Sequence, residues 1–320
     1  MADQRSDDPS LNPAQREVLE QLGATANQRP DFSAELRYEL RGELEKALHD
    51  HVMLLGEDDP VYASKHAVAA IHGCETKFLA EREFPGWSVP LVKGTVVHKA
   101  IELTINWRGE PFPADLVDES IASLEFTESE LGRFLQDISD ADRAQLRGDA
   151  VDLVTKFHEC WPKLDRKWRP VTESKVRLEL FGGKVVIQGK IDLTLGRANG
   201  LRAGKVLVDL KSGTFRPQHL DDLRHYALIE AIRIGVPPRR IASYYLDQGR
   251  FHAEDVSEDL LFAAAARAAD AVKKMIELHL ERRTPLLIAG PQCRWCALGT
   301  SCETGQRHLN TYDDPLEDLL

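Results

Sequence analysis

The sequence predicts an α/β (α+β) protein in which a central β-sheet is enclosed by a mostly helical envelope. The first observation is a change of period: apolar residues recur at helical spacing before residue 170 and alternate with polar residues from 171 to 211. The second is that helical and strand patterns alternate from 218 onward. With 320 residues, 42% of them hydrophobic, the chain can form one large domain or two small ones with a substantial core.

The segments before residue 170 predict helices. Residues 1–30 are polar, and we expect them to be loose. Helix-forming residues and helical spacing predict helices over 31–55, 62–83 and 95–107 and mostly helical structure over 114–168. The second of these would carry Cys74 and the third His98.

The segments after residue 170 predict a sheet and its covering helices. Residues 171–180 and 185–195 alternate on either side of the turn Gly182-Gly183, and 205–211 alternates again. Further patterns predict a helix over 218–235, a strand over 241–246 and an Ala-rich helix over 256–283.

Charge is unevenly distributed along the chain. The net charge is −11, but residues 1–60 hold 14 acids and 6 bases (−8), and residues 303–320 hold 5 acids and 1 base (−4). The remainder, 61–302, therefore has 33 acids and 34 bases (+1), and within it 200–250 has 9 bases and 5 acids (+4). A local basic groove for nucleic acid fits this distribution, and so does an ordinary solvated surface.

Several features point to a cytoplasmic protein. No apolar run approaches the ~20 residues of a membrane span. The acidic N-terminus lacks the apolar region of a signal peptide. Three of the five cysteines fall within ten residues, a spacing that favours a metal site over disulfides. The phosphate-binding pattern GxxxxGK[ST] is missing from the sequence, so a helicase would be a separate chain.

Two adjacent predicted strands carry a carboxylate–lysine constellation. Asp192 lies within GKIDLTL, and Asp209 and Lys211 lie two apart in VLVDLK, on one face of their strand. An antiparallel pairing would bring the two carboxylates together, where they could bind a hard divalent cation. The lysine could then stabilise charge on a phosphate. Alternatively, these side chains could occupy the solvent face of an edge strand.

Together these segments resemble the PD-(D/E)XK nuclease signature in its RecB-type and AddB-type form. GKIDL and DLKSG resemble its two strands, and GTVVHKAIE resembles its upstream histidine segment, which contributes His98. The following helix in that family carries Gln and Tyr four apart. Tyr226 matches here, whereas Asp222 occupies the Gln position. Glu173 resembles a recurrent acid of the family.

The resemblance, over about residues 62–304, implies a restriction-endonuclease-like fold, with a mixed central sheet flanked by helices. It implies Mg²⁺ or Mn²⁺ held by His98, Asp192, Asp209 and the backbone carbonyl of Leu210. The alternative for His98 is a structural histidine on an amphipathic helix. It also implies that Lys211 activates water. Glu173 and Tyr226 would join the catalytic residues, and Tyr226, Arg216 and Arg224 could contact DNA.

The cysteines form a second constellation. Cys293, Cys296 and Cys302 have the spacing C-x2-C-x5-C, and Cys74 stands alone upstream. Four thiolates suit zinc or an iron–sulfur cluster, although structural zinc sites usually use two short pairs. Four buried reduced thiols are the remaining alternative. The resemblance to AddB-type and CRISPR-associated adaptation nucleases implies a [4Fe–4S] clasp. Cys160 is interpreted as a buried or incidental thiol.

The expected organisation has three parts. Residues 1–60 would be an acidic, partly helical extension, 61–304 a nuclease domain closed by the iron–sulfur clasp, and 305–320 an acidic tail. The C-terminal iron–sulfur segment would pack against the helical N-terminal region. The implied function is an exonuclease acting on single-stranded DNA or DNA ends in repair, recombination or CRISPR adaptation. Helicases or CRISPR and repair factors are possible protein partners. One alternative is a DNA-binding iron–sulfur scaffold with little or no hydrolysis. A weaker alternative is an iron–sulfur electron carrier, since the sequence has no second redox motif.

Overall fold

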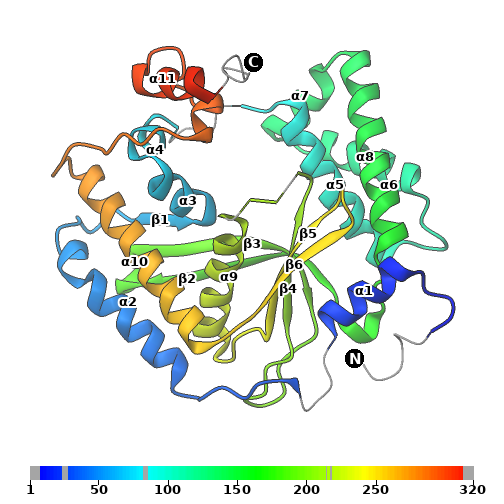
Figure 1. The fold of residues 1–320 in the computed structure, drawn as a ribbon, viewed down its shortest axis with the longest axis horizontal. Helices are drawn as coiled ribbons and strands as arrows, with labels where there is room; N and C mark the ends of the chain where they lie inside the picture. The colour runs from blue at the N-terminus through cyan, green and yellow to red at the C-terminus, as the bar shows by residue number, and fades with distance from the viewer. Residues whose placement is uncertain (1–7, 24–27, 82–85, 214, 217, 313–320) are drawn as a thin grey trace, which may run out of the picture. The chain divides into compact units, whose positions relative to one another are not determined.

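The computed structural model describes residues 8–23, 28–81, 86–213, 215–216 and 218–312. Figure 1 shows the chain, with the residues outside these ranges drawn in grey. The chain forms two compact units, each assembled from three segments. The first unit comprises Met1–Glu39, Gly86–Val176 and Lys190–Leu261. The second comprises Leu40–Pro85, Arg177–Gly189 and Phe262–Leu320.

Within the described residues, six strands form one mixed sheet in the order β1-β3-β4-β5-β6, with β2 also paired to β3. The strands are β1 (Val61–Ser64), β2 (Val171–Leu180), β3 (Val185–Leu195), β4 (Val206–Lys211), β5 (Arg240–Tyr245) and β6 (Arg250–Asp255). The pairs β1/β3 and β4/β5 are parallel, whereas β3/β4 and β5/β6 are antiparallel. The expected mixed sheet flanked by helices is confirmed.

The first unit contains most of the helical envelope. Its helices include α1 (Pro13–Leu22), α5 (Val89–Asn106), α6 (Pro113–Glu125), α7 (Glu130–Asp137), α8 (Asp140–Cys160) and α9 (Gln218–Ile234). Helices α5, α6 and α8 pack on one another, and α9 packs on β4 and β5. The apolar faces of α5, α6 and α8 join strand residues such as Leu193 and Val208 in one hydrophobic core. This core supports the strands that carry the acidic residues.

The second unit contains the cysteine segments. Strand β1 pairs with residues 185–188 of β3 and leads into α3 (Lys65–Gly73) and α4 (Glu75–Ala80). The 3₁₀ helix η4 (Pro291–Trp295) packs against α11 (Glu303–Tyr312). The long helices α2 (Leu36–Val52) and α10 (Glu258–His279) each begin in segments of the first unit and continue in the second.

The structure differs from the sequence-based expectation in several elements. The helix expected over 62–83 begins instead with strand β1, and residues 65–80 form two helices interrupted at Cys74, whose backbone is extended. Residues 82 and 83 lie outside the described residues. Ser64 caps α3 by accepting a hydrogen bond from the Ala67 backbone, which explains the helix start. Helices α1 and α11 and strand β6 lie where no regular structure was expected.

The expected domain bounds of 1–60, 61–304 and 305–320 stay a prediction. Residues 1–7 and 313–320, which belong to the two acidic ends, lie outside the described residues. In the part of the chain that the structure describes, every helix is too short or too polar to cross a membrane.

Candidate functional site

The β3/β4 pair brings the two predicted carboxylates together. Leu193 pairs with Val208 in the antiparallel register, and one further step places Asp192 opposite Asp209. The Leu210 backbone N–H donates to Asp192 Oδ2 over 2.8 Å. The side chains are buried, with residue exposures of 7% for Asp192 and 1% for Asp209. Because β4 is paired on both sides, the alternative of an exposed edge strand is wrong.

Helix α5 delivers His98 to this strand pair. The helix begins with Pro90 in its first turn and buries Val92, Val96 and Val97 in the core. His98 Nε2 donates to the Leu210 carbonyl oxygen over 3.0 Å, and its Nδ1 lies 3.6 Å from Asp192 Oδ1. A proton on Nε2 leaves a lone pair on Nδ1, directed toward the carboxylates. This is the arrangement of a metal-binding histidine oriented by a backbone carbonyl.

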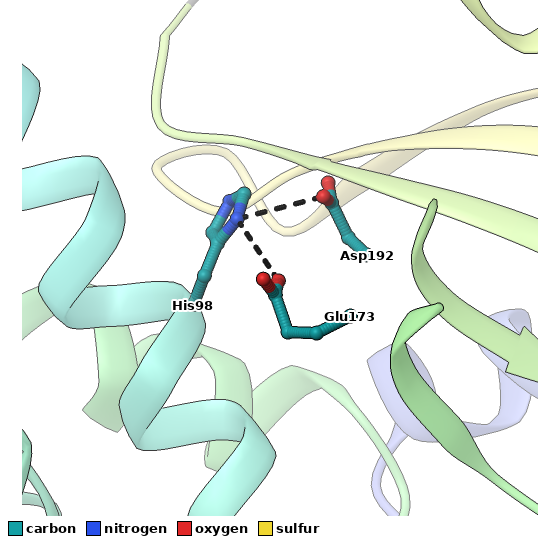
Figure 2. A group of neighbouring side chains, drawn as sticks. All are labelled: His98, Glu173 and Asp192. Carbon is teal, nitrogen blue, oxygen red and sulfur yellow. Dashed lines mark ion pairs between the residues drawn. The ribbon is translucent and has the colours of Figure 1, made fainter. Parts of the chain in front are cut away.

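Glu173 completes a compact group of three. Its Oε1 lies 3.9 Å from His98 Nδ1, and its Oε2 pairs with Lys190. Ligand atoms of His98, Glu173 and Asp192 all lie within 4.8 Å of one another (Figure 2). Glu173 has a φ of 52°, a left-handed conformation that is costly for a non-glycine residue. Strain of this kind, held by surrounding structure, is a feature of functional sites.

The donor set fits a divalent cation. Two carboxylates and an imidazole converge, and carboxylate oxygens are preferred by Mg²⁺ and Mn²⁺. The imidazole favours Mn²⁺ over the harder Mg²⁺. Leu210, expected as a carbonyl ligand, accepts the His98 N–H here, and its second lone pair remains compatible with that role.

Lys211 lies between two carboxylates. Its Nζ is 2.8 Å from Asp209 Oδ2 and 3.0 Å from Asp222 Oδ2. Asp222 extends from α9, so the residue at the family's usual Gln position is an ion-pair partner of the lysine. The sequence identified Asp222 as a departure from the family, and the structure gives it a contact.

Two further residues of this region were not anticipated. His219 Nδ1 lies 2.9 Å from the Tyr245 hydroxyl, joining α9 to the end of β5. Burial, reinforced by the positive charge of Lys211, lowers the pKa of His219 to about 4. Burial likewise raises the pKa of Tyr245. The spacing of 219, 222 and 226 on one helix face was the available sequence signal.

The three residues expected to contact DNA have varied positions. Tyr226 is 1% exposed, and the expected contact of its ring with DNA stays a prediction. The guanidinium of Arg224 makes two hydrogen bonds of 2.9 Å to Glu254 and lies 3.3 Å from Asp221. Arg216 is exposed near the start of α9, where a DNA contact remains a prediction.

The four cysteines predicted to act together all belong to the second unit and line one small cavity of about 20 Å³. Three of their sulfurs accept backbone N–H groups: Cys74 from Ile288, Cys293 from Gly290 and Cys302 from Gly305. Among the described residues, no three thiols come within 4.8 Å of one another. Sulfurs around one zinc ion at ~2.3 Å would lie about 3.8 Å apart. Among the described residues, the four thiols are therefore not gathered as ligands of one ion, and the expected iron–sulfur clasp stays a prediction.

The fifth cysteine lies apart from this cavity. Cys160 ends α8 in the first unit, where its Sγ would lie 2.9 Å from a Cβ added at Gly249. This close approach agrees with the interpretation of Cys160 as a packed thiol.

Comparison with known families decides the identity of the fold. A family model described as the PD-(D/E)XK nuclease superfamily matches residues 62–303. The chain belongs to the PD-(D/E)XK nuclease superfamily. Nucleases of this superfamily typically use Mg²⁺ or Mn²⁺, and membership supports nuclease activity on DNA. No curated protein matches the chain.

Two solved structures are similar to this chain. A candidate exonuclease from Eubacterium rectale is 13% identical, with 87% of this chain and 93% of that chain covered and a TM-score of 0.44. The protein SSO0001 is 14% identical, with 84% and 97% covered and a TM-score of 0.34. Similarity at these identities and TM-scores carries no argument about activity.

Proposed function

We propose that this PD-(D/E)XK protein is a RecB/AddB-type, metal-dependent DNA exonuclease that acts on single strands or DNA ends. The observation that carries the proposal is the convergence of His98, Glu173 and Asp192 beside Asp209 and Lys211. These residues come from three successive strands and from α5, which lies far upstream, so their meeting is a property of the fold. Repair, recombination and CRISPR adaptation are the pathways that such an activity would serve.

His98, Glu173, Asp192 and Asp209 would hold Mg²⁺ or Mn²⁺. When bound, the cation supplies polarisation of the scissile phosphate and a lowered pKa of a coordinated water. The Leu210 N–H fixes Asp192 Oδ2, and the Leu210 carbonyl orients the His98 ring. Both ligands are thereby set before the cation arrives.

Lys211 supplies positive charge where the phosphate would react. Its Nζ is held by Asp209 and Asp222, which restrict a flexible side chain to one position. From there the ammonium group can stabilise negative charge that develops on the phosphate. Arg216, exposed near the start of α9, would contact the DNA strand.

We further propose that Cys74, Cys293, Cys296 and Cys302 hold a [4Fe–4S] cluster. The shared cavity, the three N–H···S bonds and the division of the cysteines into one and three along the chain support this proposal. The cluster would be structural, because the cysteines and the acidic site belong to different units. Purified protein should show iron and a broad visible absorbance.

Digestion of 5′- and 3′-end-labelled single-stranded DNA with Mn²⁺ tests the nuclease proposal. Asp209→Asn and Lys211→Ala, each with normal iron content, should lose at least about 100-fold in rate. Asp221→Asn is the matched control, because Asp221 neighbours Asp222 on α9 but pairs with Arg224. Undiminished digestion by the first two variants would contradict the site.

The paired state of Lys211 favours one alternative, a DNA-binding scaffold without hydrolysis. Two carboxylates within 3.0 Å of its Nζ could keep the lysine from a phosphate. Calorimetric titration with Mn²⁺ separates the proposals: a nuclease site binds the ion, and Asp192→Asn weakens that binding. DNA binding with neither metal binding nor digestion would establish the scaffold.

A further inference from the structure

Helix α4 of the second unit carries a carboxylate that is almost completely buried. Glu75 directly follows Cys74 and is 1% exposed. A buried charge is costly unless it is paired and hydrogen-bonded, so its partners indicate what the position requires.

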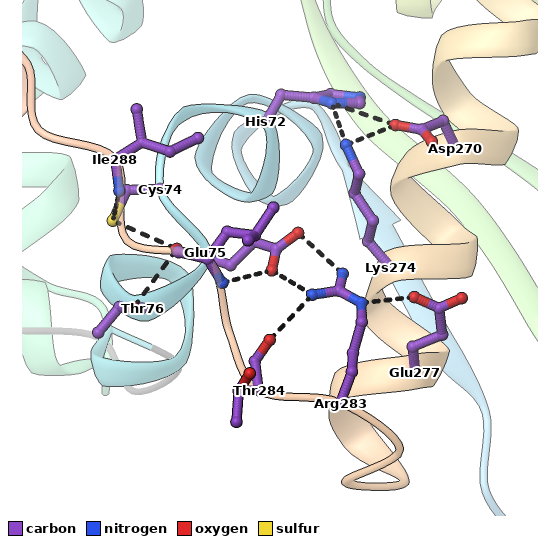
Figure 3. Close-up of polar contacts among 11 residues, drawn as sticks. His72, Cys74, Glu75, Thr76, Asp270, Lys274, Glu277, Arg283, Thr284 and Ile288 are labelled. Carbon is purple, nitrogen blue, oxygen red and sulfur yellow. Dashed lines mark hydrogen bonds and ion pairs between the residues drawn. The ribbon is translucent and has the colours of Figure 1, made fainter.

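The partners of Glu75 come from the segment that precedes the cysteine triad. The Arg283 guanidinium donates to both Glu75 oxygens over 2.5 and 2.8 Å, and the Leu286 backbone N–H donates to Oε2 over 2.8 Å (Figure 3). Arg283 is itself held by Glu277 of α10 through a 2.6 Å bond. Hydrogen bonding from Arg283 is the main cause that lowers the pKa of Glu75, against the opposing effect of burial.

The same contacts set the position of Cys74. The Leu286 carbonyl accepts from the Thr76 backbone N–H at 3.3 Å and from its hydroxyl at 3.4 Å. Two residues later, the Ile288 N–H donates to Cys74 Sγ at 3.5 Å. Glu75 therefore fixes the chain that covers the Cys74 sulfur.

A second carboxylate acts at the other end of α4. Glu81, the residue after the helix, accepts from the Ala297 backbone N–H at 3.1 Å and pairs with Lys77. Ala297 directly follows Cys296, so this bond holds the loop inside the triad. One carboxylate thus engages the chain before Cys293, and the other engages the chain after Cys296.

We propose that Glu75 and Glu81 are positioning residues that hold Cys74 and the triad segment together without any bound cluster, so that α4 preforms the cysteine site. The purpose of this positioning rests on the cluster proposed under Proposed function. The contacts that carry the proposal are between protein groups alone. A preformed site avoids ordering two distant segments at the moment of binding, a cost that otherwise reduces affinity.

Thiol labelling of the full-length protein tests the preformed site. Protein isolated without oxygen is divided, one part is freed of iron by a chelator, and alkylation of each cysteine is followed by mass spectrometry. In the iron-free part, Glu75→Gln should raise the alkylation rate of Cys74 about 10-fold or more, since a bond to a charged group is lost. Glu81→Gln should raise the rate of Cys296 and leave Cys74 unchanged.

The position-specific pattern separates positioning from general destabilisation. Glu45→Gln, which removes an exposed pair with Arg41, is the matched control and should change neither rate. If Glu75→Gln does not fold, the milder Glu81→Gln still decides the question. If Cys74 and Cys296 are each alkylated at the same rate in the folded variants as in the wild type, the proposal is overturned.

Iron measurements on the untreated part keep the two proposals distinguishable. Glu75→Gln should release iron to a chelator about 10-fold faster than wild type. A wild-type protein that never carries iron would contradict the cluster, while the labelling pattern would still decide the positioning role. A stable cluster with unchanged labelling in the variants would contradict the positioning role alone.

Discussion

At the scale of single residues, Glu173 combines strain with a functional position. Its left-handed backbone costs roughly 1–2 kcal/mol, and its side chain lies beside Asp192 as well as pairing with Lys190. The strain and the nearby second carboxylate do not stabilise the metal-free fold, whereas both would serve the proposed cation site. The sequence could indicate Glu173 only through family resemblance, because a φ angle leaves no trace in the alternation of a strand.

Replacing Glu173 should therefore separate stability from metal binding. Glu173→Gly removes the strained conformation and one like charge, and it also removes the half-exposed pair with Lys190, which contributes about 0–1 kcal/mol. We therefore expect the metal-free protein to be stabilised by about 1 kcal/mol. We expect Mn²⁺ affinity to fall about 10-fold or more, since a carboxylate ligand is lost. Urea unfolding and calorimetry measure the two effects. A variant that is less stable and binds Mn²⁺ normally would contradict both parts.

Asp222 is expected to act on turnover through Lys211. Asp222→Ala removes the 3.0 Å contact with Nζ, so the lysine should adopt other rotamers and kcat should fall about 10-fold with little change in KM. Asp222→Gln, which restores the family's usual residue and an oxygen acceptor, should remain within about threefold of wild type. Steady-state digestion measures this, and equal kcat for Asp222→Ala and wild type would remove Asp222 from the mechanism.

His219 should make stability depend on pH. Its pKa is about 4 in the folded protein and about 6.5 unfolded, so between these values the unfolded chain binds more protons. Stability is therefore complete above pH 6.5 and is lost as the pH falls toward 4. Between pH 7 and 5 this amounts to about 1–2 kcal/mol. His219→Asn should reduce the loss by that amount in urea unfolding; an unchanged pH dependence would contradict the burial of a neutral ring.

At the scale of elements, the strand pair that carries Asp192 and Asp209 depends on a close backbone approach. A Cβ at Gly204 would lie 2.1 Å from the Arg197 carbonyl oxygen, at the connection between β3 and β4. Gly204→Ala should therefore destabilise the protein by roughly 1–3 kcal/mol. Gly148→Ala is the control, because a Cβ there, within α8, meets nothing within 4 Å and should stabilise by about 0.5–1 kcal/mol. Thermal unfolding compares the two.

Elements with a strong local pattern could be predicted, and those without one could not. β2, β3 and β4 alternate over six or more residues, which fixed their positions and faces in advance. β1 has only four residues and leads directly into α3, so its pattern merges with the helix. β6 reads Arg-Phe-His-Ala-Glu-Asp, too polar to suggest a strand, and is held by pairing with β5.

The candidate site shows the same division. Asp192, Asp209 and Lys211 were predictable because strand periodicity places them on neighbouring strands. His98 required the family resemblance, and its bond to the Leu210 carbonyl required the structure. The contacts of Asp222 and His219 arise where α9 packs against the sheet, and helix packing is not encoded in local spacing.

At the scale of the whole molecule, the acidic site and the cysteine site belong to different units. Each site is also organised by contacts of its own unit: Leu210 and His98 in one, Glu75 and Arg283 in the other. The two proposed metal requirements can therefore be tested separately, since losing one cofactor would remove few contacts that organise the other site.

Selective removal of each metal should produce distinct defects. Removal of Mg²⁺ or Mn²⁺ should abolish digestion at once and leave iron content and visible absorbance unchanged, with activity restored by adding the cation. Removal of iron should abolish the visible absorbance but leave residues 286–302 resistant to proteolysis, because Glu75 and Glu81 join that segment to α4 without the cluster, while Mn²⁺ binding measured by calorimetry falls less than about threefold. Simultaneous loss of iron and Mn²⁺ binding would show that the cluster supports the acidic site directly, and the two sites would then have to be treated as one.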